Sequence, residues 1–144
     1  MRIRTKQKGT AAVEFALVAP LLCLAILGMI EIGRAIQVQA ALTNAVREGC
    51  RGFADSTATL TSGYQTGTAT YAEYLVADSL SNANIGINTG HVTITAVATP
   101  VTVSGIAMTQ ATVTATMPYS SISYFPAFIL AGKHLSATVT MKKS

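Results

Sequence analysis

The feature of this sequence that most limits its fold is an uncharged apolar run close to the N-terminus. Residues Phe15–Ile30 (FALVAPLLCLAILGMI) contain no Asp, Glu, Lys or Arg. As a helix this run spans roughly 24 Å, and adding Thr10–Val13 gives roughly 30 Å, the thickness of a hydrocarbon core. Length and polarity together are typical of a membrane-spanning helix, so we expect the chain to be anchored in a bilayer.

Charge is scarce in the chain and unevenly placed. Only 11% of the 144 residues are charged, whereas a soluble domain carries about 25%. Arg2, Arg4, Lys6 and Lys8 precede Gly9, and the rest of the chain is formally neutral. By the positive-inside rule, these basic residues keep the N-terminus in the cytoplasm and send the C-terminus outside. Because the excess charge is confined to this short leader, we expect no binding to nucleic acid.

A secretory signal peptide competes with the membrane anchor, since both combine basic residues with an apolar run. However, the run ends in MIEIGRAIQVQ, which offers no small-x-small cleavage site. Apolar residues also continue at helical spacing, at Ile32, Ala35, Ile36, Ala40, Leu42, Ala45 and Val46. The pattern predicts one long helix over Thr10–Phe53. Pro20 should kink this helix, because proline donates no backbone hydrogen bond.

The rest of the chain predicts a small α+β head. A loop rich in Ser, Thr and Gly (Asp55–Thr70) leads to a second helix over Tyr71–Ala83. Three stretches then alternate Val and Thr with period two, which predicts strands over His91–Val103, Met108–Tyr119 and His134–Lys143. These strands are expected to form an antiparallel sheet of three to four strands, in which Pro100 ends or bulges the first strand.

Two further features of the head concern its packing. No Asp, Glu, Lys or Arg occurs from Ser79 to Gly132. This suits either a head packed against neighbouring chains or a sheet made polar by Thr and Ser alone. The connection SSISYFPAFILAGK carries Phe125, Phe128, Ile129 and Leu130, which we expect to cap the core in a short turn or helix.

The sequence contains no recognisable catalytic or metal-binding constellation. His91 and His134 have no acid or cysteine nearby, and there is no C-x-x-C, H-E-x-x-H or glycine-rich phosphate loop. Cys23 and Cys50 would lie about 40 Å apart on one helix, too far for an intrachain disulfide. We interpret Cys50 as a semi-buried thiol, with a disulfide between subunits as the alternative. The chain is therefore expected to be no enzyme and to need no metal or cofactor.

Two acids on the long helix require an explanation. Glu14 lies at the start of the apolar segment, and an unpaired carboxylate costs roughly 2.5 kcal/mol or more at the bilayer centre. Glu31 and Arg34 are three residues apart and can pair across one helical turn. We expect this pair to mark the outer membrane–water boundary, with a role in a filament interface as a second interpretation.

The order of residues around Gly9 resembles the processing motif of type IV prepilins. Basic residues, Gly9, four small or apolar residues, Glu14 and Phe15 directly precede the apolar helix. The wider strings GTAAVEFALVAPLLCLAILGMIEIGRA, QAALTNAVREGCR and TVTATMPY resemble the TadE-like family. These proteins are minor pilins, or pseudopilins, of the tight-adherence (Flp) type IVc pilus system. The resemblance implies a pilin-like fold and cleavage by a prepilin peptidase between Gly9 and Thr10.

Further expectations follow from this resemblance. Residues 1–9 would be the leader, 10–53 the transmembrane and assembly helix, and 54–144 the extracytoplasmic head. Expected partners are the prepilin peptidase, other pilin subunits with their assembly machinery, and the lipid bilayer before assembly. The expected location is the bacterial inner membrane, or an extracellular pilus after assembly. A pilin of this type would cross the membrane once.

Within this picture Glu14 has a specific role. Cleavage would free the α-amino group of Thr10, whose reference pKa is about 8. In an assembled bundle, Glu14 can pair with this amine of a neighbouring subunit and set the axial stagger between helices. Two other functions stay open: the main repeating subunit of its own filament, or a membrane-anchored adhesive module whose Thr-rich head binds a surface.

Overall fold

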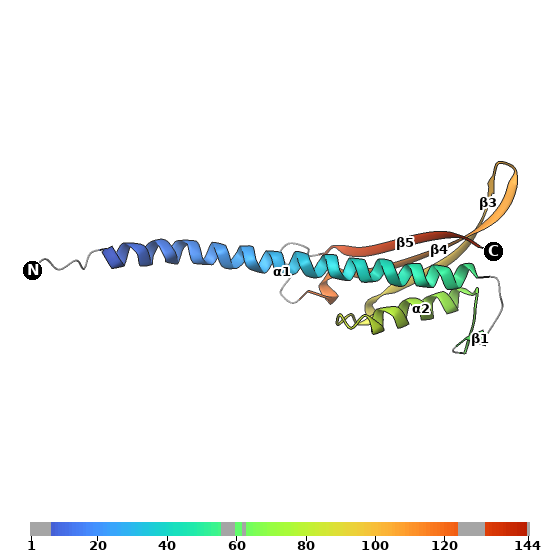
Figure 1. Ribbon diagram of the computed structural model, residues 1–144, viewed down its shortest axis with the longest axis horizontal. Coiled ribbons are helices and arrows are strands. Elements are labelled where there is room, and N and C mark those ends of the chain that lie inside the picture. The colour runs from blue at the N-terminus through green and yellow to red at the C-terminus, as the bar shows by residue number, and fades with distance from the viewer. Residues whose placement is uncertain (1–6, 56–59, 62, 124–131, 144) are drawn as a thin grey trace, which may run out of the picture.

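The structure is a computed structural model that describes residues 7–55, 60–61, 63–123 and 132–143. One long helix, α1 (Gln7–Ala54), runs the length of the molecule and projects far beyond a small head (Figure 1). The head adds a second helix, α2 (Ala69–Asn82), and a three-stranded antiparallel sheet. The α+β, pilin-like fold class predicted from the sequence is therefore confirmed.

The strands of the head follow one another as an antiparallel meander. The sheet consists of β3 (Thr93–Val103), β4 (Ile106–Pro118) and β5 (His134–Lys143), in the order β3-β4-β5. Two 3-10 turns, η1 (Thr89–His91) and η2 (Tyr119–Ser121), lie before β3 and after β4. A separate two-residue hairpin, β1 (Leu60–Thr61) with β2 (Tyr64–Gln65), lies within the stretch that the sequence predicts as a loop.

The helices and the sheet form two layers with one core between them. α1 packs against β4 and β5, and α2 packs against α1 and β3 (Figure 1). Along the second half of α1, buried side chains recur every three or four residues, at Val38, Leu42, Ala45, Val46, Cys50 and Phe53. This spacing keeps them on one helical face, and their burial removes apolar surface from water. The helix that projects from the head thus also forms the head's central element.

The sheet separates an apolar face from a threonine face. Along β4 the buried residues alternate with threonines, at Ala111, Val113, Ala115 and Met117. The threonines on the opposite face bond across the strands, Thr112 to Thr140 at 3.0 Å and Thr114 to Thr138 at 3.1 Å between hydroxyl oxygens. Period-two alternation therefore produces a sheet with one face on the core and one polar face.

Two glycines allow α1 and α2 to approach closely. A β-carbon at Gly49 would collide with the Val76 side chain and lie 2.9 Å from the backbone oxygen of Ala72. A β-carbon at Gly52 would collide with Leu75 and lie 2.9 Å from the Tyr71 ring. A side chain at either position would push the helices apart, since helix backbones come this close only where side chains are absent.

The start of α2 is fixed by a cap that the sequence reasoning missed. The Thr68 hydroxyl accepts a hydrogen bond from the backbone N–H of Tyr71 at 3.2 Å, as N-cap threonines commonly do. The helix accordingly begins at Ala69, two residues before the predicted start.

The end of α1 is held by residues far away in the sequence. Lys143 Nζ donates to the backbone oxygens of Phe53 at 3.0 Å and Gly67 at 2.6 Å. The backbone N–H of Gly67 in turn donates to the oxygen of Gly52 at 2.9 Å. Gly67 has a φ of 76°, and a β-carbon there would collide with the Asp55 backbone. These bonds satisfy carbonyls that a helix end otherwise leaves unpaired.

One prediction about the sheet was wrong. Pro100 neither ends nor bulges β3, which continues in unbroken register with Pro100 opposite Thr109. β3 is an edge strand, where alternate backbone N–H groups point away from the sheet and a proline removes no ladder bond. The predicted cap from Phe125, Phe128, Ile129 and Leu130 lies outside the described residues.

Cys50 lies deeper than the sequence suggested. Its side chain is fully buried rather than semi-buried, and its Sγ lies 3.3 Å from the Ala111 oxygen and 3.4 Å from the Val139 oxygen. Burial raises the pKa of the Cys50 thiol above its ordinary value of 9.0. A buried thiol cannot reach a second subunit, so the interpretation as a structural thiol is favoured over a disulfide between subunits. Cys23 is exposed on the projecting part of α1.

The close approach at Gly49 leads to a first prediction. Gly49→Ala should destabilise the head by about 1–3 kcal/mol, because the added methyl overpacks the contact with α2. Gly33→Ala is the matched control on the same helix, since nothing lies within 4 Å of a β-carbon there. The control should be neutral or stabilising by up to about 1 kcal/mol. Urea unfolding of the full chain in detergent measures the free energy of unfolding of both variants. Equal values for Gly49→Ala and Gly33→Ala would contradict the close contact between α1 and α2.

A second prediction concerns the thiol. In a Cys23→Ala background, Cys50 should react with maleimide only as fast as the head unfolds, and immediately in denaturant. Because the pKa of Cys50 is raised in the folded state, the thiol keeps its proton to a higher pH there than in the unfolded chain. The contribution of Cys50 to stability should therefore be lost as pH rises above about 9. Rapid labelling of the folded protein at neutral pH would show that the thiol is accessible.

Candidate functional site

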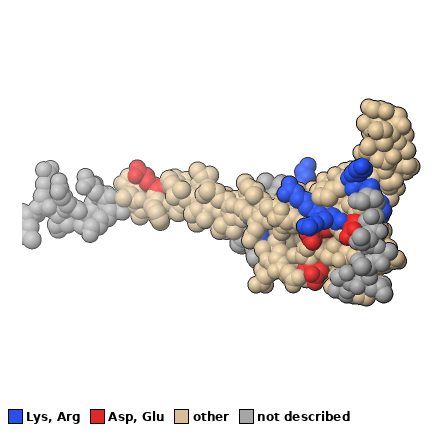
Figure 2. Space-filling view, turned by 45° about the vertical axis from the view of Figure 1, so that its right-hand side comes forward, with Lys and Arg blue, Asp and Glu red and all other residues tan. Residues whose placement is uncertain are grey.

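The first half of α1 presents an apolar surface that none of the described residues of the head covers. Its large side chains are exposed from Val13 to Ile30, among them Phe15, Leu17, Leu21, Leu24 and Met29. Residues Gly9–Ala54 form a helix long and apolar enough to cross a membrane, with a peak mean hydropathy of 2.4. Figure 2 shows this projection as an almost uncharged surface, while charged side chains gather over the head. Such a surface requires lipid or other apolar helices around it.

The predicted cleavage and register residues lie at the far end of this surface. Gly9, Thr10, Glu14 and Phe15 all belong to the first turns of α1 and are exposed. The Glu14 carboxylate follows Thr10 by about one helical turn and lies on the projecting helix, away from the head. Its position therefore leaves it accessible to a group from another molecule. α1 continues through Pro20 without a break, and the predicted kink stays a prediction.

Glu31 lies where the projecting helix meets the head. Its side chain is only 8% exposed, and its Oε1 accepts a hydrogen bond from the Ser123 hydroxyl at 2.9 Å. The fully buried Tyr119 donates its hydroxyl hydrogen to the backbone oxygen of Glu31 at 3.1 Å. Burial, and then the charge of Glu31, raise the pKa of Tyr119 above its ordinary value of 10.0.

Arg34 adds a third connection at the same level. It is half-buried, and its Nη2 donates to the backbone oxygen of Ile85, in the turn after α2. We call Glu31, Arg34, Ile85, Tyr119 and Ser123 the neck cluster. The structure shows both Glu31 and Arg34 bound to the head, and their pairing across one helical turn stays a prediction. Tyr119 and Ser123 were missed because they lie about ninety positions away in the chain.

The neck cluster fixes how much helix the head leaves free. From Thr10 to Glu31, α1 extends roughly 32 Å at about 1.5 Å per residue. This length matches a hydrocarbon core of about 30 Å. The buried polar contacts thus begin where the uncovered apolar helix has become long enough to span a bilayer.

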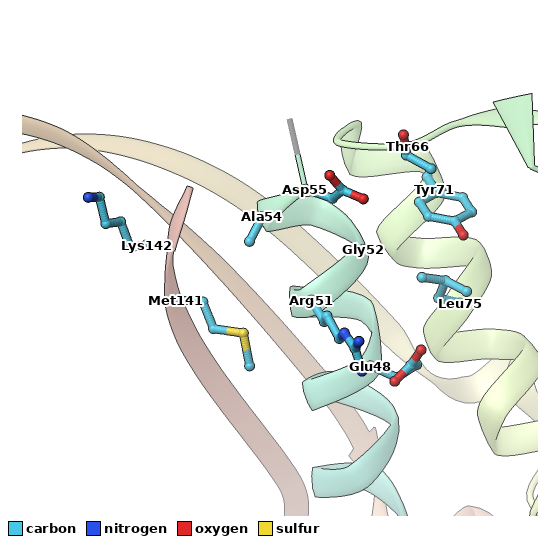
Figure 3. Close-up of a pocket in the computed structure, with 10 residues that line it drawn as sticks. All are labelled: Glu48, Arg51, Gly52, Ala54, Asp55, Thr66, Tyr71, Leu75, Met141 and Lys142. Atoms are coloured by element: carbon cyan, nitrogen blue, oxygen red, sulfur yellow. The ribbon is translucent and has the colours of Figure 1, made fainter. Parts of the chain in front are cut away.

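The opposite end of the head has an open pocket of about 580 Å³ (Figure 3). Tyr71 and Leu75 of α2 lie on one side, Met141 and Lys142 of β5 lie on the other, and Glu48 and Arg51 of α1 lie between them. Among the residues that the structure describes, no group of three His, Cys, Asp or Glu could hold a metal ion. His91 and His134 are exposed at the ends of η1 and β5 and do not line this pocket.

The buried hydroxyl of Tyr119 supplies a third prediction. Tyr119→Phe should lower the free energy of unfolding by about 0.5–1.5 kcal/mol, through loss of one buried hydrogen bond. In the parent protein the raised pKa also means that stability falls as pH rises above about 10, and the variant should lose that part of the decline. Tyr74→Phe is the control. The ring of Tyr74 stacks on the ring of Tyr64 with 4.7 Å between their centroids, and the substitution keeps that ring. Urea unfolding at neutral and alkaline pH gives the stability of the parent and of both variants. If the stability of Tyr119→Phe fell with pH as much as that of the parent, the decline would not come from Tyr119.

Comparison with known proteins gives one family match. Residues 9–51 match the family model described as TadE-like protein. No curated protein and no solved structure matches the chain. The matched residues begin at Gly9 and include the apolar run, the neck residues Glu31 and Arg34, and the glycine at the α1–α2 contact, Gly49. They confirm the resemblance seen in the sequence and group the N-terminal helix of this chain with the TadE-like proteins, which are associated with the tight-adherence pilus.

Proposed function

We propose that this chain is a pilin-like structural subunit, a minor pilin that supports assembly of a tight-adherence pilus. The observation that carries the proposal is the uncovered apolar half of α1, which follows a basic leader and carries a single acid in its first turns. Such a helix can reside in a bilayer and later exchange lipid for the helices of other subunits. The match to TadE-like proteins over residues 9–51 supports the same role.

In this proposal a prepilin peptidase cuts between Gly9 and Thr10 on the cytoplasmic side of the inner membrane. The new N-terminus of α1 then combines the amine of Thr10 with the positive end of the helix dipole. Glu14 of a neighbouring subunit pairs with that amine and fixes the stagger between adjacent helices. Phe15 and the apolar residues after it supply the non-specific part of the helix contact.

The neck cluster gives the head a role in this assembly. Because Glu31 and Arg34 bind head residues, the head is held at a set distance from Thr10. A subunit with a fixed head position can transmit the stagger of its helix to the outer surface of a filament. Partners would be the peptidase, other pilin subunits and the assembly machinery, with the bilayer as the environment before assembly. We propose no catalytic activity.

The processing step is tested by intact mass. The membrane-extracted protein should have the mass of a chain that starts at Thr10, and Gly9→Val should leave it at full length. Gly33→Val is the matched control, since it changes a glycine of the same helix outside the cleavage motif. Full-length masses for parent and both variants would contradict prepilin processing and make the protein an uncleaved signal-anchor protein.

The role of Glu14 is tested separately from cleavage. Glu14→Ala should be processed normally but fail to enter sheared pili, measured by immunoblot of the pilus fraction against the membrane fraction. Glu48→Ala is a control that removes an exposed acid of the same helix within the head. Normal incorporation of Glu14→Ala would refute the register role while leaving processing intact.

A further inference from the structure

Lys143, the last residue of β5, contacts two other segments of the head at once. Its Nζ donates to the backbone oxygen of Phe53, at the end of α1, and to that of Gly67, in the turn before α2. The same Nζ lies 4.3 Å from the centre of the Phe53 ring, as in a cation–π contact. One ammonium group therefore connects the ends of α1 and β5 with the chain that leads into α2. We call these contacts the lysine latch.

The lysine latch adds β5 to a contact that α1 already makes. The backbone N–H of Gly67 donates to the oxygen of Gly52 at 2.9 Å, so the turn and the helix end touch without Lys143. Hydrogen bonds from a charged donor are roughly twice as strong as those between neutral groups. Lys143 is also half-buried, so water competes less for its bonds than on an open surface. The latch is therefore a strong local connection between β5 and the other two segments.

Cys50 lies beneath the part of β5 that the lysine latch holds. It precedes Phe53 by about one helical turn, it is fully buried, and its Sγ lies 3.4 Å from the Val139 oxygen. β5 is an edge strand that pairs with β4 alone, so its end can separate without breaking the pairing between β3 and β4. Separation of β5 from Lys143 back to Val139 would uncover the Cys50 thiol.

We propose that the lysine latch is a conformational device that keeps the end of β5 closed over α1. With the latch in place, the end of β5 opens only when the head unfolds as a whole. Without it, Val139–Lys143 separates from α1 and β4 while the rest of the head stays folded. A segment at the edge of a sheet opens locally when few contacts hold it, at a lower free energy than global unfolding.

The closed position of β5 has two consequences for the surface of the head. β4 pairs with β5 from Thr109 to Pro118, and separation of β5 would leave backbone N–H and C=O groups of β4 unpaired. Such a free edge pairs readily with strands of other chains. Met141 and Lys142 also form one wall of the open pocket in Figure 3, so the latch holds that wall in place. The inference concerns the head alone and does not rest on the proposed pilin-like assembly.

The Cys50 thiol serves as the reporter in the first experiment. In a Cys23→Ala background, maleimide labelling of the full chain in detergent is compared between the parent and Lys143→Met, which keeps the alkyl chain but removes the N–H donors. Labelling of Lys143→Met should be at least about tenfold faster, the factor that about 1.4 kcal/mol represents. It should also be faster than the global unfolding of the same variant, measured by circular dichroism after dilution into urea and extrapolated to zero urea.

Lys142→Met is the matched control for this experiment. Lys142 is the neighbouring residue of the same strand, but it is exposed, and its side chain points away from α1 in Figure 3. The control therefore removes a positive charge from the end of β5 and leaves the lysine latch intact. We expect it to label Cys50 as slowly as the parent.

A second experiment breaks the lysine latch from the side of the turn. A β-carbon at Gly67 would collide with the Asp55 backbone oxygen, so Gly67→Ala must shift the turn that Lys143 holds. Gly63→Ala is the matched control, because φ is 80° at Gly63 and 76° at Gly67 and both substitutions strain the backbone alike. Nothing lies within 4 Å of a β-carbon at Gly63. Gly67→Ala should label Cys50 at least about tenfold faster than Gly63→Ala.

Three results would overturn the inference. Equal labelling rates for Lys143→Met and Lys142→Met would show that Lys143 does not hold β5 closed. Labelling of Lys143→Met only as fast as it unfolds globally would show that the end of β5 does not open separately from the head. Where Lys143→Met does not fold, the two glycine variants decide the question, and equal labelling of Cys50 in both would refute the latch.

Discussion

The head of the molecule depends on the packing of the second half of α1 against β4 and β5. This face of the helix buries Val38, Leu42, Val46 and Cys50 completely. Among the described residues, the first half of the same helix has no such cover, so one continuous helix has a buried half and an exposed half. The position of the neck, the approach of α2 and the direction of the projecting segment all follow from where this burial begins and ends.

Much of the fold could be predicted from the sequence because its signals are local. An uncharged run identifies the projecting helix, and alternation of valine with threonine identifies all three strands, with β5 correct at both ends. Pro100 was misjudged because the cost of a proline depends on whether its strand is at an edge, which is a property of the sheet order. The burial of Cys50 was likewise underestimated, since β4 and β5 cover it from distant positions in the chain.

The site shows the same division between local and distant information. Gly9, Thr10, Glu14 and Phe15 form a contiguous motif and were identified from sequence alone. Tyr119 and Ser123 lie 88 and 92 positions from Glu31, and no spacing rule connects them. The tip of the β3–β4 hairpin was also not predicted to stand clear of the sheet, because this depends on where β5 ends, at Lys143 opposite Thr109.

The bonds between α1 and β5 also fix an order of events in biogenesis. Gln39 contacts Ser136, Cys50 contacts Val139 and Phe53 contacts Lys143, so contacting residues are 97, 89 and 90 positions apart. Contacts of such long range form late, because the intervening chain must be available first. In the topology that we propose, with the first half of α1 in the bilayer, the second half therefore stays half-covered in the extracytoplasmic space until β5 has been translocated. In the same proposal, a subunit whose head is incomplete would expose the face of α1 meant for β5, and so would differ from a finished subunit before it entered a filament.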